Sequence, residues 1–191
     1  MKIEDMEIDG YQKERLTMSG VWANSFSLLI LIPIILIFGL PYYLIWVDGS
    51  IIESIYGEVS FLTLFAMFIL GIVLHELIHG IFFAKYAKNG FKSIKFGILW
   101  KYFAPYCHCK EPLNVGNYIV AVIMPTIILG VLPSIISILT GNILLLFIGV
   151  IFTVAGAGDI LILYSLRKTN KTDFIMDHPS EIGCYVFRKI L

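Results

Sequence analysis

Two histidines and a glutamate stand at a spacing that suits metal-dependent hydrolysis, in the segment His75-Glu76-Leu77-Ile78-His79. Histidines four residues apart share one face of a helix, so both imidazoles can reach a single Zn²⁺ ion. Glu76 lies about 100° around the helix from His75, near enough to handle a water molecule without binding the ion itself. The pattern predicts Zn²⁺ as a cofactor, with His75 and His79 as ligands and Glu76 as the catalytic acid and base.

A catalytic zinc ion usually takes three protein ligands and keeps its fourth position open for water. We expect Asp159 to be the third ligand. His75 and His79 precede Lys85, the first basic residue after their apolar run, by roughly 15 and 9 Å of helix, and Asp159 precedes Arg167 by roughly 12 Å. The three residues would therefore lie at one depth, and a carboxylate inside an apolar run needs such a partner.

Two residues of the connection at 85–116, Glu111 and His108, are alternatives for the third ligand, because a loop could reach toward the metal. Cys107 and Cys109 flank His108, and on an extended chain the thiols alternate with the imidazole. This alternation favours a structural role, or a place in the lining of a substrate entrance, over a separate metal site. The tail segment Asp177-His178-Pro179-Ser180-Glu181 is predicted to be a turn, because Pro179 disfavours helix at His178.

The elements that must position these residues are membrane helices. The chain has 191 residues, of which 58% are hydrophobic and 15% charged, and its mean hydropathy is +0.86, values far from those of soluble domains. Four apolar runs are long enough to cross roughly 30 Å of hydrocarbon. They span residues 24–47, 59–84, 117–140 and 142–166. We expect an all-α membrane protein in which residues 1–191 form a single integral membrane domain with four transmembrane helices.

Basic residues predict the orientation of these helices. Every Lys and Arg lies before the first run, in the loop 85–116, or in the tail 167–191, whereas the connection 48–58 has three acids and no base. By the positive-inside tendency, both termini and the loop 85–116 are expected in the cytosol of a multi-pass cell-membrane protein, and the richness in Ile and Lys points to a prokaryote. The net charge of zero is uninformative about partners, and because no basic tract is present, no nucleic-acid partner is expected.

The loop between the second and third runs is expected to fold. Residues 93–96 alternate polar with apolar side chains, and aromatic residues continue to Tyr106. This alternation predicts a β-hairpin at the membrane face, within residues 91–106. With only three cysteines, all on the predicted cytosolic side, reduced thiols are expected.

Several segments together resemble a bacterial and archaeal family of membrane zincin peptidases. The segments that carry the resemblance are His-Glu-Leu-Ile-His-Gly at 75–80, Pro-Tyr-Cys-His-Cys-Lys-Glu-Pro at 105–112, Gly-Ala-Gly-Asp-Ile at 156–160 and Asp-His-Pro-Ser at 177–180. More distantly, the chain is similar to the site-2 intramembrane metalloproteases, which also place an Asp ligand on a later span and a hairpin between. The resemblance implies zinc at His75, His79 and Asp159, with Glu76 as the acid and base. In the site-2 proteases this Asp lies in a Leu-Asp-Gly sequence, which differs from the sequence around Asp159.

These inferences predict a zinc-dependent, membrane-embedded endopeptidase that hydrolyses peptide bonds of membrane protein or peptide substrates through a zinc-activated water. A substrate helix would have to be unwound, and the edge of the hairpin could accept it by strand addition. Two alternatives are a catalytically idle metal-binding or scaffold protein of the membrane and a small metal-ion transporter. The intact Glu76 argues against the first, and four spans without repeats argue against the second. No feature of the sequence sets the oligomeric state.

Overall fold

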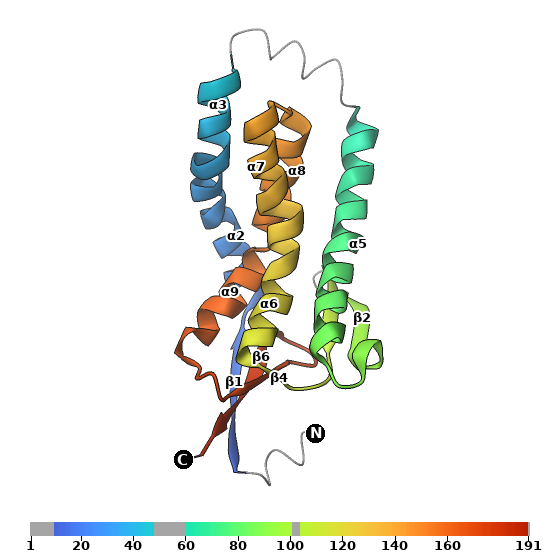
Figure 1. Cartoon of the computed structure of the whole chain (residues 1–191), viewed down its shortest axis with the longest axis vertical. Coiled ribbons are helices and arrows are strands. Elements are labelled where there is room, and N and C mark those ends of the chain that lie inside the picture. The colour runs from blue at the N-terminus through green and yellow to red at the C-terminus, as the bar shows by residue number, and fades with distance from the viewer. Residues whose placement is uncertain (1–9, 48–59, 101–103, 191) are drawn as a thin grey trace. The chain divides into compact units, whose positions relative to one another are not determined.

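The computed structural model describes residues 10–47, 60–100 and 104–190. It contains four helical stretches that are long and apolar enough to cross a membrane, and these match the four predicted runs to within four residues at each end (Figure 1). Their bounds are Gly20–Trp46, Phe61–Tyr86, Val115–Thr140 and Ile143–Lys168. Residues 48–59 of the first connection and 101–103 of the predicted hairpin lie outside the described residues.

Three of the four stretches are built from consecutive helical segments. The first comprises α2 (Gly20–Ile34), η1 (Ile35–Gly39) and α3 (Leu40–Trp46), and the second is the uninterrupted α5 (Phe61–Tyr86). The third comprises α6 (Val115–Pro125), η3 (Thr126–Val131) and α7 (Leu132–Thr140), and the fourth α8 (Ile143–Ala155), α9 (Ala157–Ser165) and η4 (Leu166–Lys168). A further short helical turn, η2 (Gly90–Ser93), follows α5.

Prolines explain the irregular segments of the first and third stretches. The segments η1 and η3 are π-helical, and each ends two residues before a proline, Pro41 or Pro133. A proline lacks an N–H donor and its ring clashes with the carbonyl four residues earlier, so the helix widens locally to give the carbonyls other donors.

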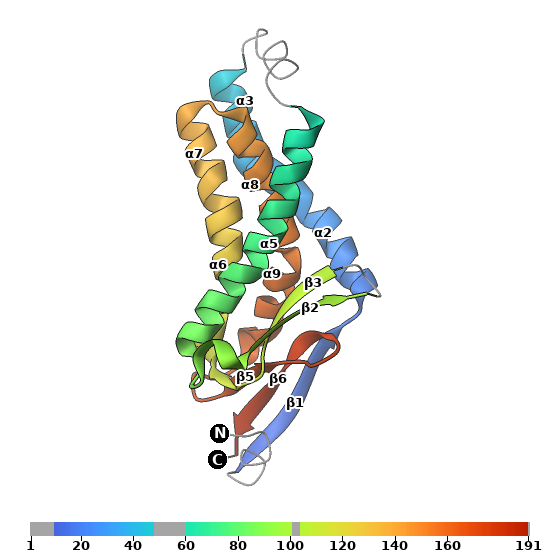
Figure 2. The same cartoon turned by 90° about the vertical axis from the view of Figure 1, so that its right-hand side faces the viewer.

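Two antiparallel sheets accompany the helices, so the all-α expectation was too narrow. The predicted hairpin is present as β2 (Ile94–Leu99) and β3 (Ala104–Cys109), with Ile94 opposite Cys109 (Figure 2). The second sheet was not predicted and has the order β1-β6-β5-β4. Its strands are β1 (Tyr11–Met18), β6 (Ile182–Lys189), β5 (Phe174–Asp177) and β4 (Leu113–Asn114). It escaped prediction because β1 is mostly polar and pairs with a strand at the opposite end of the chain.

The chain divides into two compact units, each made of separate stretches of sequence. The first unit comprises the described residues of Met1–Ala23, Glu76–Met124 and Gly158–Leu191, and the second comprises those of Asn24–His75 and Pro125–Ala157. Both sheets belong to the first unit. The assignment of residues 1–191 to one domain stays a prediction.

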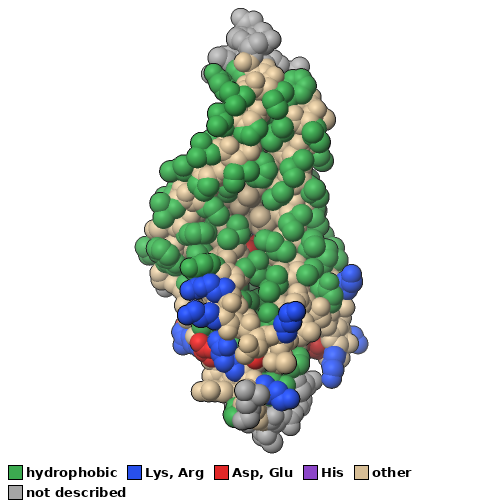
Figure 3. Space-filling view, turned by 60° about the vertical axis from the view of Figure 1, so that its left-hand side comes forward, with side chains coloured by type: hydrophobic (Ala, Val, Ile, Leu, Met, Phe, Trp, Pro, Cys, Tyr) green, Lys and Arg blue, Asp and Glu red, His purple; other side chains and the backbone are tan. Residues whose placement is uncertain are grey.

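The core of the first unit lies where the end of α5 and the start of α6 meet the four-stranded sheet. Phe83 of α5, Tyr118 and Ala121 of α6, and Ile175 and Val186 of the sheet are each at most 2% exposed. On the face shown in Figure 3, hydrophobic side chains cover most of the surface, and the Lys and Arg side chains gather in one zone. Large apolar side chains exposed along the long helices are what a lipid environment would cover.

Candidate metal centre

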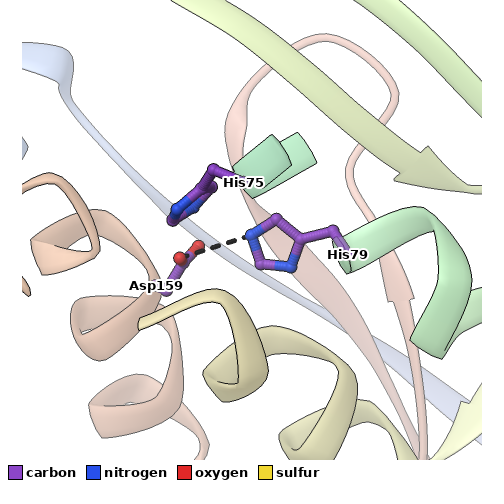
Figure 4. A group of neighbouring side chains, drawn as sticks. All are labelled: His75, His79 and Asp159. Carbon is purple, nitrogen blue, oxygen red and sulfur yellow. Dashed lines mark ion pairs between the residues drawn. The ribbon is translucent and has the colours of Figure 1, made fainter. Parts of the chain in front are cut away.

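Helix α5 carries His75 and His79 one turn apart, and α9 carries Asp159 in its first turn. The three side chains turn toward one another (Figure 4). One ligand atom from each, two imidazole nitrogens and a carboxylate oxygen, all lie within 4.8 Å of one another. In the part of the chain that the structure describes, this is the one group of three or more His, Cys, Asp or Glu that could hold a metal ion.

The separation between His79 and Asp159 fits a zinc ion. Zinc binds imidazole nitrogen and carboxylate oxygen at about 2.0 Å, so two ligand atoms on a tetrahedral ion lie about 3.3 Å apart. His79 Nε2 and Asp159 Oδ2 are separated by 3.3 Å. Three such donors also leave the fourth position that a catalytic zinc keeps open for water. The residues present therefore fit the ion that the sequence predicted.

A backbone carbonyl orients the His79 ring. His79 Nδ1 lies 3.0 Å from the carbonyl oxygen of Ala121 in α6. Because a carbonyl oxygen only accepts, Nδ1 must carry a proton and donate it, so in the neutral ring the lone pair lies on Nε2, the atom that faces Asp159 and would bind a metal. This is the arrangement that fixes the tautomer of metal-binding histidines. The ring is buried and stacks on Phe83, with 6.0 Å between ring centroids.

Glu76 follows His75 directly in α5 and is partly buried. Its charge reaches Cys107 of the hairpin strand β3. Burial raises the pKa of the Cys107 thiol well above its usual range, and the negative charge of Glu76 acts in the same direction. The hairpin therefore passes close to the residue expected to be the acid and base.

A second contact brings the hairpin to the turn of α5 that carries His79. The Phe96 ring of β2 packs over Gly80, because a Cβ atom placed on Gly80 would lie only 2.4 Å from Phe96 Cζ. Glycine at position 80 thus permits the close approach of the ring.

Glu111, one of the alternative third ligands, makes hydrogen bonds away from the metal-ligand group. Its carboxylate accepts hydrogen bonds from the Lys88 N–H and the Ser93 hydroxyl, both at 2.7 Å, and from the Asn89 amide. Burial alone would raise the pKa of Glu111, but these hydrogen bonds outweigh it and lower the pKa. Glu111 therefore joins the end of α5 to the base of the hairpin. The other alternative, His108, lies in β3 and is not part of the metal-ligand group.

Asp177 has a role that the sequence did not reveal. It ends β5, and its carboxylate accepts hydrogen bonds from the Tyr118 hydroxyl and the Cys109 N–H. Burial raises the pKa of Asp177 above its ordinary value, although both hydrogen bonds oppose the shift. The predicted turn begins one residue later, where His178 Nδ1 accepts the N–H groups of Ser180 and Glu181. In the sequence, the one hint of this role was that Asp177 directly precedes His178 and Pro179.

The three cysteines carry free thiols. Cys109 and Cys184 are each 1% exposed. Burial raises the pKa of both thiols to about 12. Protonated, inaccessible thiols are packing groups, which supports the structural reading of the triplet at 107–109.

Comparison with known proteins gives one match. The family described as "Putative zincin peptidase" matches residues 68–174. The matched stretch is more than half of the 191 residues and contains His75, His79 and Asp159. Neither the curated proteins nor the solved structures gave a match. By the extent of this match, and in keeping with its His-His-Asp group, the chain belongs to the putative zincin peptidase family.

Proposed function

We propose that this protein is a zinc-dependent, membrane-embedded endopeptidase that hydrolyses peptide bonds of membrane protein or peptide substrates. The observation that carries the proposal is the convergence of His75, His79 and Asp159 from two long apolar helices. Charged and metal-binding groups are costly inside a membrane helix, so a cluster of them indicates function.

Each residue of the site has a distinct role in this proposal. His75, His79 and Asp159 would hold Zn²⁺, which when bound acidifies a water molecule and stabilises negative charge on a carbonyl oxygen. The Glu76 carboxylate accepts a proton from the attacking water and then delivers it to the nitrogen of the leaving amine. The carbonyl of Ala121 keeps His79 Nδ1 protonated throughout.

The hairpin offers a place for the substrate. Among the described strands, β2 pairs only with β3, so its other edge can take a further strand. The Phe96 contact with Gly80 keeps that strand beside the turn of α5 that follows His79. A locally unwound substrate that adds to β2 would present its peptide bonds in extended form near the metal ligands.

The distribution of basic residues supports a cell-membrane location with both termini and the hairpin in the cytosol. Lys85 lies in the last turn of α5 and Arg167 and Lys168 at the end of the fourth stretch. With this orientation the site would lie in the cytosolic half of the bilayer, roughly 12 Å from the surface.

The test compares purified wild type with Glu76→Gln. Zinc content is measured by mass spectrometry, and cleavage is measured on a panel of membrane-peptide substrates in proteoliposomes. We expect Glu76→Gln to retain zinc and to lose cleavage by about 10²- to 10⁴-fold, because removing a general acid and base costs that much. Removing zinc with a chelator should abolish wild-type cleavage, and adding zinc should restore it.

Three results would contradict the proposal. Unchanged cleavage by Glu76→Gln would remove the assigned role of Glu76. Zinc-loaded wild type that cleaves no peptide of the panel would favour the idle metal-binding or scaffold alternative. Zinc-dependent ion flux through the proteoliposomes would favour transport.

A further inference from the structure

The carboxylate of Asp177 joins three segments of the first unit. Asp177 is the last residue of β5, its Oδ1 atom accepts a hydrogen bond of 2.6 Å from the Tyr118 hydroxyl of α6, and its Oδ2 atom accepts one of 2.7 Å from the Cys109 N–H of β3. Tyr118 is 1% exposed. Because both partners are donors, the position needs two acceptor oxygens, which a carboxylate has and a carboxamide lacks.

Helix α6 connects Asp177 to the candidate metal centre by two routes. Tyr118 packs on Phe83 with 5.6 Å between ring centroids, and Phe83 stacks on His79. Ala121 lies about one helical turn beyond Tyr118, and its carbonyl accepts the Nδ1 proton of His79 at 3.0 Å. Tyr118, which is hydrogen-bonded to Asp177, and Ala121, which orients His79, therefore lie on the same face of α6.

We infer that Asp177 is a positioning residue for the metal centre: by holding Tyr118 against the hairpin and the sheet, it keeps the Ala121 carbonyl where it directs His79 Nε2 toward Asp159. The inference rests on the metal site of the proposed function and does not depend on which reaction the metal performs. The loss of a group that orients a metal ligand without binding the metal itself typically changes metal affinity by about 10- to 100-fold.

The chain offers a matched control for this role. Glu111 also fastens the base of the hairpin, through the Lys88 N–H, the Ser93 hydroxyl and the Asn89 amide, but these partners lie around the end of α5 and not in α6. A Glu111→Gln variant would loosen the hairpin without releasing Tyr118. Asp177→Asn keeps the shape of the side chain and removes one of its two acceptors.

The experiment measures zinc affinity of the full-length protein in detergent by competition with a fluorescent chelator, without any substrate. Wild type, Asp177→Asn, Tyr118→Phe and Glu111→Gln are compared, and circular dichroism verifies folding. We expect zinc affinity to fall by about 10- to 100-fold in Asp177→Asn and Tyr118→Phe, and to change less than about threefold in Glu111→Gln. The absorption spectrum of the Co²⁺-loaded protein should shift in the first two variants alone, because the ligand geometry changes.

Zinc affinity in Asp177→Asn equal to that of wild type, or an equal loss in Glu111→Gln, would overturn the inference. If Asp177→Asn does not fold, Tyr118→Phe decides the question, because it removes the same hydrogen bond from α6 and keeps the buried ring. Wild type that binds zinc but cleaves nothing would refute the peptidase proposal alone, whereas wild type without zinc affinity would refute both.

Discussion

Substituting Gly80 tests whether its contact with Phe96 holds the hairpin beside His79. A Cβ atom on Gly80 would lie 2.4 Å from Phe96 Cζ and 3.0 Å from Cε1. Ordinary carbon contacts are about 3.5–4.0 Å, so the end of the ring would have to retreat by more than about 1 Å. Phe96 is 48% exposed, so its ring can move. We therefore place the cost near the lower end of the overpacking range, at about 1 kcal/mol.

The Gly80→Ala substitution also has a favourable effect that must be separated from the clash. Alanine within a helix is favoured over glycine by about 0.8–1.0 kcal/mol. The net change in the free energy of unfolding is therefore expected near zero. In a Phe96→Ala background the clash is absent, so the same substitution should stabilise the protein. The coupling between positions 80 and 96 should then be about 1 kcal/mol.

The assay is a double-mutant cycle on wild type, Gly80→Ala, Phe96→Ala and the double variant, with the free energy of unfolding measured by reversible denaturation in mixed micelles. Gly158→Ala serves as the control, because a Cβ atom at position 158 meets nothing within 4 Å. It should stabilise equally with Phe or Ala at position 96. If Gly80→Ala changes the free energy of unfolding equally in both backgrounds, within about 0.3–0.5 kcal/mol, the ring does not lie over Gly80 as described.

Two further predictions concern the hairpin and the tail. The thiols of Cys109 and Cys184, whose pKa is raised to about 12, should resist maleimide labelling at pH 8 until the protein unfolds, and mass spectrometry that finds them labelled in the folded protein would contradict their burial. Burial lowers the pKa of His178 from its ordinary value of 6.5, so the unfolded state takes up the proton first. The stabilisation that His178 provides is full above about pH 6.5 and is lost as pH falls through its lower folded-state pKa. Denaturation curves should show this loss in wild type and a smaller one in His178→Gln, and identical curves would refute it.

Local patterns were sufficient to predict the helices and the hairpin. An apolar run of sufficient length in lipid forms a helix because its backbone groups can find hydrogen-bond partners only within the segment. The pairing of His75 with His79 is equally local, because four residues make about one turn of α5. The alternation at residues 93–96 likewise predicted β2, whose side chains point to opposite faces of the hairpin.

The four-stranded sheet and the environment of the metal ligands depended on contacts between distant segments. Tyr11 of β1 lies opposite Lys189 of β6, and the sequence of neither strand predicts which strand it pairs with. Matching depth predicted Asp159 as a companion of the histidines, but only packing brought its Oδ2 atom to 3.3 Å from His79 Nε2.

The orientation of His79 shows most clearly what the sequence determined and what it left to the fold. The sequence determined that residue 79 is a histidine on the same helix face as His75. The tertiary structure decided which of its nitrogens can bind a metal, because the Ala121 carbonyl accepts the proton of the other. Every residue has a backbone carbonyl, so no sequence pattern identifies the one that orients His79. Its position depends on α6, which Asp177 holds through Tyr118 from 59 residues away in the sequence.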